Sequence, residues 1–233
     1  MLCIMGTSEH EKATAQGYDR WAASYDDQDP STWLDEPFLL QHLQAYPGCR
    51  ILDLGCGTGR YLRLLAESTS WIVGVDLSCN MLARARARIA DRTDIRLVQA
   101  SVTSLPFVQG CFDRVVSGLV IDHVASAAQL FTGIASVLAP QGRAVIAAVH
   151  PDMQRMTGSD IEIAASDQDA IRIPGCLHEV EDLLTAARHA GLMLIVKDEP
   201  SITPAMVEHR PQWRRKLGCP ALVLLMLAKK KMT

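Results

Sequence analysis

Three glycines and a later aspartate have the types and spacing expected of a nucleotide site. The segment Asp-Leu-Gly-Cys-Gly-Thr-Gly-Arg (53–60) follows an apolar run, with glycine at Gly55, Gly57 and Gly59. Glycine lets a backbone turn tightly and approach a ligand closely. Asp76 follows Gly55 by 21 residues and ends the next apolar run, where a carboxylate can accept both hydroxyl hydrogens of a ribose. Together they predict a nucleotide-like ligand.

The place of the third glycine separates two kinds of nucleotide ligand. A dinucleotide fingerprint needs glycine at position 60, where the helix packs close to the pyrophosphate, but residue 60 is Arg. The segment Ile-Leu-Asp-Leu-Gly-Cys-Gly-Thr-Gly (51–59) instead resembles motif I of the class I S-adenosylmethionine-dependent methyltransferases. The segments Tyr-Asp-Arg-Trp-Ala-Ala-Ser-Tyr-Asp (18–26) and Val-Gly-Val-Asp-Leu-Ser (73–78) are similar to the ubiquinone/menaquinone methyltransferase group.

This resemblance implies S-adenosyl-L-methionine as the cofactor and assigns contacts to it. Asp53 would order the glycine loop and the amino-acid end of the cofactor, Asp76 would bind the ribose, and Tyr25 would lie over the cofactor. Ser101 and Val102 stand where the family has an acidic residue and a small residue beside the adenine. Serine can still accept a hydrogen bond there, but without charge. The resemblance also places at the cofactor Gly55, Cys56, Gly57, Gly59, Leu77, Met81, Gly118 and Leu119.

Asp122, His123 and His150 are the candidates for a catalytic base. They follow the fourth and fifth apolar runs that we expect to be strands. In-line methyl transfer requires alignment, exclusion of water and, where the acceptor carries a proton, a base. Each of the three could equally be a loop residue that satisfies backbone groups. Both readings stay open, and no metal is expected.

Seven short apolar runs are expected to form the strands that position these residues. They span residues 50–54, 71–76, 96–99, 112–117, 143–149, 192–196 and 222–227. Helical patterns lie between most of them: Met81, Ala85 and Ile89 share one face, and Gly142 is expected to end a helix. Such alternation requires parallel strands joined by helical crossovers. We predict an α/β fold: a doubly wound, Rossmann-like seven-stranded sheet with a parallel core, a C-terminal antiparallel strand and helices on both faces.

The chain is expected to form a single domain, 1–233, in three parts. Residues 1–49 would be a helical cap, 50–150 the cofactor-binding core, and 151–233 a substrate-side insertion with the C-terminal strands. Ligands of such sheets bind at the carboxyl ends of the strands. The length leaves no room for an added target-recognition domain, which favours a small-molecule acceptor.

Composition and charge exclude several classes of protein. The formal charge of −3 lacks the basic excess of a nucleic-acid-binding protein. The longest clean apolar run, 221–228, is far shorter than the roughly 20 residues of a membrane-spanning helix. Seven scattered cysteines without CxxC spacing support neither a disulfide framework nor a zinc site, which favours the cytoplasm. The pattern leaves a homodimer open.

The expected function is methyl transfer from S-adenosylmethionine to an O, N or C atom of a small metabolite. Three alternatives remain at this stage. The first is a fold relative that binds the cofactor without methylating, such as a lyase or cyclase. The second is a nicotinamide-dependent oxidoreductase, which Arg60 disfavours. The third is a non-catalytic binding protein on the same core.

Overall fold

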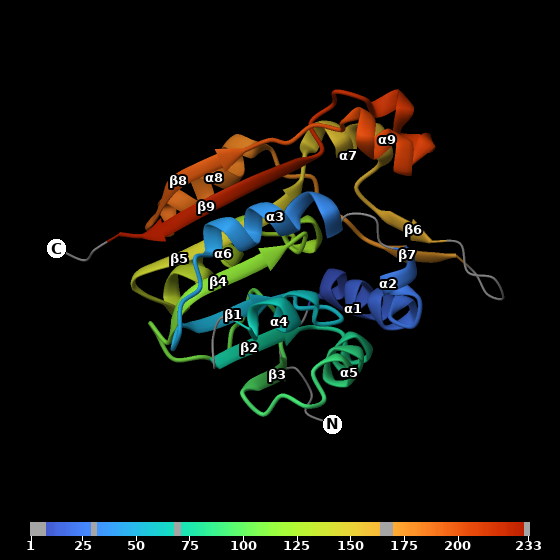
Figure 1. Ribbon diagram of the computed structural model, residues 1–233. Helices are drawn as coiled ribbons and strands as arrows, with labels where there is room; N and C mark the ends of the chain where they lie inside the picture. The colour runs from blue at the N-terminus through green and yellow to red at the C-terminus, as the bar shows by residue number, and fades with distance from the viewer. Residues whose placement is uncertain (1–7, 29–31, 68–70, 164–169, 231–233) are drawn as a thin grey trace.

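A seven-stranded sheet forms the centre of the computed structural model, which describes residues 8–28, 32–67, 71–163 and 170–230 (Figure 1). The strand order is β3-β2-β1-β4-β5-β9-β8. Neighbours from β3 to β5 are parallel, whereas β9 runs antiparallel to both β5 and β8. This confirms the predicted α/β sheet with its parallel core. The strands are β1 Arg50–Leu54, β2 Trp71–Asp76, β3 Ile95–Gln99, β4 Phe112–Gly118, β5 Leu138–Val149, β8 Leu192–Asp198 and β9 Leu222–Lys229.

Helices cover both faces of the sheet because successive strand residues point to opposite sides. Leu52 and Leu54 of β1 pack in one core with α6 (Ala127–Val137) and α8 (Val180–His189). Ile51 of the same strand packs in a second core on the other face. That second core contains residues of α3 (Thr32–Leu43), α4 (Arg60–Leu65) and α5 (Cys79–Arg88). The doubly wound arrangement is therefore confirmed.

The N-terminal helices divide between two roles. Helices α1 (Glu9–Trp21) and α2 (Tyr25–Gln28) lie beyond the arrowheads of β1 and β4 in Figure 1, at the carboxyl ends of the parallel strands. Helix α3 instead lies across the sheet face and buries Leu39 and Leu43 there. Among the described residues of the expected cap 1–49, α1 and α2 therefore lie at the carboxyl ends of the strands, whereas α3 belongs to the layer that covers the sheet.

The segment after β5 contains elements that the sequence did not indicate. After α7 (Pro151–Thr157), strands β6 (Ile161–Ile163) and β7 (Ile171–Ile173) form a small antiparallel sheet beside α1 (Figure 1). Ile171 and Ile173 share a third core with Trp21 of α1. Strands β6 and β7 therefore hold α1 in place at the carboxyl ends of the parallel strands.

The prediction that Gly142 ends a helix is wrong. Helix α6 ends at Val137, and Gly142 lies inside β5. A Cβ at this position would stand 2.8 Å from the carbonyl oxygen of Ala139, so close backbone packing explains the glycine.

Three short helices complete the described chain: η1 Ile121–His123, α9 Pro204–His209 and η2 Pro211–Lys216. No helix within the described ranges is both long enough and apolar enough to cross a membrane.

Candidate functional site

A cavity of about 1550 Å³ lies between the carboxyl ends of the parallel strands, α1 and the segment around β6. The residues after β1, β2, β3 and β4 and the end of β5 all line it, as expected for a ligand site in this fold. Most of the residues singled out in the sequence meet here. They are Tyr25, Gly55, Gly57, Asp76, Leu77, Met81, Ser101, Val102, Gly118, Leu119, Asp122 and His123. Asp53, Cys56, Gly59 and His150 are not among its lining residues.

The three glycines of the loop after β1 have left-handed backbones but different surroundings. A Cβ on Gly55 (φ +67°) would stand 2.2 Å from the side chain of Val120. A Cβ on Gly57 (φ +53°) would meet nothing within 4 Å, because this residue faces the cavity. Gly59 (φ +83°) precedes α4 and packs against Ala85. Gly57 therefore offers the open approach to a ligand, whereas Gly55 and Gly59 shape the loop.

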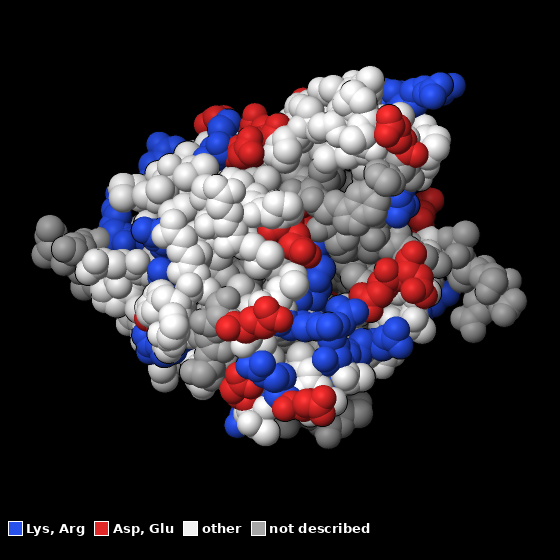
Figure 2. Space-filling model, viewed as in Figure 1, with Lys and Arg blue, Asp and Glu red and all other residues white. Residues whose placement is uncertain are grey.

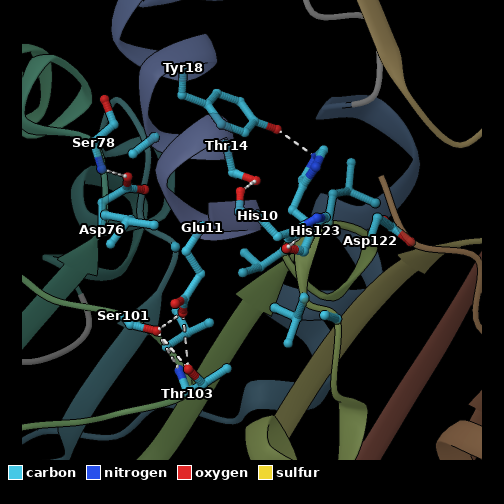
Figure 3. Close-up of a pocket in the computed structure, with 18 of the residues that line it drawn as sticks. His10, Glu11, Thr14, Tyr18, Asp76, Ser78, Ser101, Thr103, Asp122 and His123 are labelled. Carbon is cyan, nitrogen blue, oxygen red and sulfur yellow. Dashed lines mark hydrogen bonds between the residues drawn. The ribbon is translucent and has the colours of Figure 1, made fainter. Parts of the chain in front are cut away.

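Asp76 holds the glycine loop from the end of β2. Its carboxylate accepts a hydrogen bond from the backbone N–H of Gly57 at 2.8 Å. It accepts another from the N–H of Ser78 at 2.8 Å (Figure 3). Burial raises the pKa of Asp76 to about 6, and these backbone donors oppose that rise. The Ser78 hydroxyl in turn caps α5 by accepting from the N–H of Met81. A charged acceptor is thus fixed at the cavity wall.

Asp53 occupies a different position from the one expected. Its carboxylate is buried beneath the loop, and neither oxygen has a hydrogen-bond partner among the described residues. The loop contact expected of Asp53 is made by Asp76. Burial raises the pKa of Asp53 to about 8, against the opposing positive charge of Arg60. Unpartnered buried acceptors are rare in proteins, and this one suits a ligand that brings a hydrogen-bond donor.

Cys56 lies behind the loop rather than at the cavity. Its side chain is buried, and its Sγ would stand 2.9 Å from a Cβ on Gly74 of β2. Burial raises the pKa of its thiol, so the neutral form dominates. The residue fills space between loop and sheet.

The wall after β3 contains a carboxylate that the sequence did not reveal. Glu11 of α1 accepts hydrogen bonds from the hydroxyls of Ser101 and, at 3.1 Å, Thr103 (Figure 3). Its other oxygen accepts from the N–H of Ser8 at 2.8 Å, in a capping box that begins α1. The sequence signal for Glu11 was this Ser-x-x-Glu spacing, which predicts a helix start and not a site.

His123 is held by both ring nitrogens. Its Nδ1 lies 2.9 Å from the carbonyl oxygen of Pro174, which can only accept, so Nδ1 carries the proton. Burial lowers the pKa of His123 and keeps the ring neutral. Nε2 is then an acceptor, and the Tyr18 hydroxyl donates to it at 2.8 Å (Figure 3). Tyr18 lines the cavity and was not singled out in the sequence.

Asp122 also lines the cavity, beside His123. Its carboxylate accepts from the N–H of Val149 and from Nε2 of Gln154 at 3.1 Å. Burial raises the pKa of Asp122 to about 7. The carboxyl connects the ends of β4 and β5 and can hold a proton near neutral pH.

His150 serves the backbone instead of the cavity. It is the N-cap residue of α7, and its Nδ1 accepts from the N–H of Asp152 at 3.1 Å. The structure thus favours the loop-residue reading of His150.

Three residues close the cavity around the end of β4 and α2. A Cβ on Gly118 would stand 2.9 Å from Asp35 Oδ2 and from the ring of Tyr61, so only glycine fits. Leu119 has a left-handed backbone (φ +58°), which is uncommon for a non-glycine residue and typical of functional sites. The Tyr25 ring packs edge-on against Trp21 at 4.6 Å between centroids.

The charge of the cavity suits a cationic ligand. Five acidic residues line it: Glu11, Asp76, Asp122, Asp160 and Glu162. Among the described lining residues, Arg172 is the only Lys or Arg, and it pairs with Asp160. S-adenosylmethionine carries a sulfonium, a ribose and an amino-acid end with one ammonium and one carboxylate. The acidic lining suits its net positive charge, and the Asp76 acceptor suits its ribose.

Comparisons with known proteins show which family and which fold this chain resembles. Residues 52–146 match the family described as "Methyltransferase domain". The malonyl-[acyl-carrier protein] O-methyltransferase of Legionella pneumophila is 37% identical over 48% of this chain and 40% of its own length. The demethylmenaquinone methyltransferase of Beutenbergia cavernae is 36% identical over 46% of this chain and 44% of its own.

A solved structure extends the similarity over most of the chain. The S-adenosylmethionine-dependent methyltransferase of Mesorhizobium loti matches with a TM-score of 0.70 and 27% identity, over 87% of this chain and 99% of that one. In the curated relatives, the aligned part spans only 29% to 52% of their own lengths. Residues 52–146 therefore form a methyltransferase domain, in a chain with the fold of the class I S-adenosylmethionine-dependent methyltransferases.

Proposed function

We propose that this chain transfers the methyl group of S-adenosylmethionine to an O, N or C atom of a small metabolite. The observation that carries the proposal is the two-sided cavity. The Gly57 backbone and Asp76 form one side, and Tyr18, His123 and Asp122 form the other. A volume of about 1550 Å³ exceeds the roughly 300–1,000 Å³ of a pocket for one drug-sized ligand. It leaves room for the cofactor and an acceptor together.

The cofactor side would be held by residues that follow β1 to β4. Asp76 would accept the ribose hydroxyls, and Gly57 would let the backbone approach. Asp53 would take up a donor from the amino-acid end, directly or through water. Leu77, Met81 and Val102 would provide apolar contact, and Gly118, Leu119 and Tyr25 would close the methyl-donor end.

The other side would receive the acceptor and, where needed, its proton. The cofactor supplies an activated methyl carbon on a sulfonium, so the protein needs only to align, desolvate and deprotonate. The Tyr18 oxygen would take the acceptor's proton while its own proton passes to Nε2 of His123. The Pro174 carbonyl holds Nδ1–H and so keeps Nε2 directed at Tyr18. Asp122 lies beside this pair and would bind a polar or cationic group of the acceptor.

The remaining expectations belong to the same proposal. We place a single domain over residues 1–233, in the cytoplasm, acting on a small molecule and not on nucleic acid. On the face in Figure 2, basic and acidic side chains are interspersed. Partly exposed ion pairs such as Arg88–Asp26 join residues of opposite charge. Such a mixed surface lacks the single-sign field that a nucleic acid would favour. A homodimer remains an open arrangement.

Calorimetry separates this proposal from the oxidoreductase alternative. We expect the full chain to bind S-adenosylmethionine and S-adenosylhomocysteine, and not NADH. Binding of NADH without either sulfur compound would overturn the proposal. A lyase or cyclase would also bind the cofactor, so transfer of a labelled methyl group to a small molecule is needed to distinguish those classes.

A further inference from the structure

Glu11 is a charged residue from the N-terminal helix that enters the cavity wall at the end of β3. Its Oε1 accepts from the hydroxyls of Ser101 and Thr103, and its Oε2 accepts from Ser8 N–H. Ser101 is only 5% exposed, and its Oγ also accepts from the N–H of Thr103 at 3.1 Å. Figure 3 shows Glu11 extending from α1 to these two hydroxyls. The carboxylate is thus fixed from both sides.

The two carboxylate oxygens of Glu11 have different partners. Oε1 accepts from two hydroxyls, whereas Oε2 accepts from the N–H of Ser8, and the Ser8 hydroxyl also stabilises the anion. Ser101, Ser8 and Thr103 all donate to it, which outweighs burial and lowers the pKa of Glu11. The group remains an anion at neutral pH and is prepared for an N–H donor of a ligand.

The strand order indicates which part of a nucleoside would reach this anion. β2 lies between β1 and β3, and Asp76 ends β2. A ligand with its ribose at Asp76 and its amino-acid end over the β1 glycine loop must direct its base toward β3. Ser101 and Thr103 follow β3 directly. The only charge among the described hydrogen-bond partners of these two side chains is that of Glu11.

We propose that Glu11 accepts a hydrogen bond from the exocyclic amino group of the cofactor's adenine, so that α1 determines base specificity. Ser101 and Thr103 orient the carboxylate, and Ser101 itself does not carry the recognition. This inference rests on the proposed function and adds a specificity residue to the same site. It also links base recognition to the helix that carries Tyr18, because both residues belong to α1.

Binding of two nucleosides that differ at one group tests the inference. S-inosylhomocysteine has a carbonyl where S-adenosylhomocysteine has the amino group, and it would direct an oxygen at the anion. By calorimetry the full chain is expected to prefer the adenosine compound by roughly 10-fold to 100-fold, as for a charged hydrogen bond. Glu11→Gln is expected to remove most of this preference, chiefly because the variant binds the adenosine compound more weakly. Glutamine keeps the capping box, so the helix start is preserved.

Glu9→Gln is the matched control. Glu9 lies in the same first turn, is 90% exposed and pairs with Lys12 at the surface. This variant is expected to keep the wild-type preference. Thermal unfolding of each variant checks that α1 remains folded. An unchanged preference in Glu11→Gln, or an equal loss for both compounds, would overturn the inference.

Moving the carboxylate from position 11 to position 101 provides a second test of the inference. In the wild-type background, Ser101→Asp would place two carboxylates together and should weaken binding of the adenosine compound. In the Glu11→Gln background, Ser101→Asp should restore the preference, because one anion again faces the amino group. Failure of this restoration would count against the assignment. Failure of the wild type to bind S-adenosylhomocysteine at all would overturn the proposed function too, whereas binding without preference would overturn only this inference.

Discussion

The hydroxyl of Tyr18 lies 2.8 Å from Nε2 of His123 and joins the N-terminal helix to the short helix η1 after β4. Because Nδ1 of His123 donates to Pro174, the imidazole can receive a proton only at the nitrogen that faces Tyr18. In the proposed reaction, this pair would carry the proton of the acceptor from the Tyr18 oxygen to Nε2 of His123. Two segments 105 residues apart must be in place together for this route to exist.

Tyr18→Phe tests the pair as a proton acceptor. The substitution removes the hydroxyl and keeps the ring. For an acceptor that carries a proton, we expect label transfer from S-adenosylmethionine to fall about 100-fold or more. The Kd of S-adenosylhomocysteine should change by less than about threefold, because no reacting proton is involved. Tyr46→Phe, at an exposed tyrosine away from the cavity lining, is the control. A Tyr18→Phe enzyme with wild-type turnover on such an acceptor contradicts the assignment.

Asp76→Ala should remove most cofactor affinity. The change deletes the charged ribose acceptor and also the acceptor for Gly57 N–H and Ser78 N–H. A loss on the order of 2–3 kcal/mol corresponds to roughly 30-fold to 150-fold in the Kd of S-adenosylhomocysteine. Asp76→Asn keeps one carbonyl oxygen and should lie between the wild type and Asp76→Ala. Equal affinities in all three proteins would show that the ribose binds elsewhere.

Asp53→Asn should stabilise the ligand-free chain and weaken cofactor binding. The carboxyl titrates near 4 in an unfolded chain and at about 8 in the fold. Between these values the folded chain holds a proton that the unfolded chain has lost, so this residue lowers stability as pH rises from about 4 to about 8. We expect Asp53→Asn to raise the free energy of unfolding at pH 8 by on the order of 2 kcal/mol, with little change at pH 4.

Asp113→Asn is the control for Asp53→Asn, and it is expected to change the free energy of unfolding in the opposite direction. Asp113 accepts from Arg50 at 2.7 Å, and this pairing lowers its pKa. Its contribution is present above the unfolded pKa and is lost as pH falls through the folded pKa. Asp113→Asn should therefore destabilise the chain at pH 8, as measured by urea unfolding. If Asp53→Asn destabilises the ligand-free chain to the same degree, Asp53 is not an unpartnered buried acceptor.

Gly57→Ala should show whether this glycine is needed only for its left-handed backbone or also for cofactor binding. An alanine in the left-handed region costs about 1–2 kcal/mol of stability, and its methyl group would enter the cavity, where nothing lies within 4 Å. Gly48→Ala is the matched control, since Gly48 has φ +81° and open surroundings outside the cavity lining. Both variants should lose similar stability. Only Gly57→Ala should lose affinity for S-adenosylhomocysteine, by about tenfold or more, and equal affinities would place the cofactor elsewhere.

His150→Ala should affect folding and leave binding intact. The substitution removes the side-chain acceptor that caps α7, a contact whose loss typically costs about 1 kcal/mol. The midpoint of urea unfolding should fall, while the Kd of S-adenosylhomocysteine and the rate of label transfer stay near wild type. A large fall in the rate of label transfer with normal stability would instead support His150 as the catalytic base.

The sequence predicted the sheet well because most strands contain runs of Ile, Val or Leu, and because β2 and β4 end in aspartate and glycine. The bounds of β1 and β2 match the predicted runs 50–54 and 71–76. The glycine loop and Asp76 could be placed because the motif and the strand ends coincide. The three-residue strands β6 and β7 are too short to give a periodic signal.

The site residues that were missed all depend on tertiary contact. Glu11 and Tyr18 lie on α1, about 90 and 105 residues from the partners that define them. The Ser-x-x-Glu spacing of Ser8 and Glu11 indicates only a helix start, and Tyr18 is the first residue of the segment 18–26, whose resemblance places Tyr25 at the cofactor. His150 follows a strand in the chain, as a catalytic residue would, but α7 begins directly after it and uses the side chain as a cap.

The central claim is methyl transfer to a small molecule, and one measurement tests it most directly. The full chain is incubated with methyl-labelled S-adenosylmethionine and a small-molecule metabolite extract, with Asp76→Ala in parallel. We expect label to appear in a small molecule with the wild type and the amount of label to fall strongly with Asp76→Ala. Tight binding of S-adenosylmethionine with no label transferred to any small molecule would contradict it and favour a lyase, a cyclase or a binding protein.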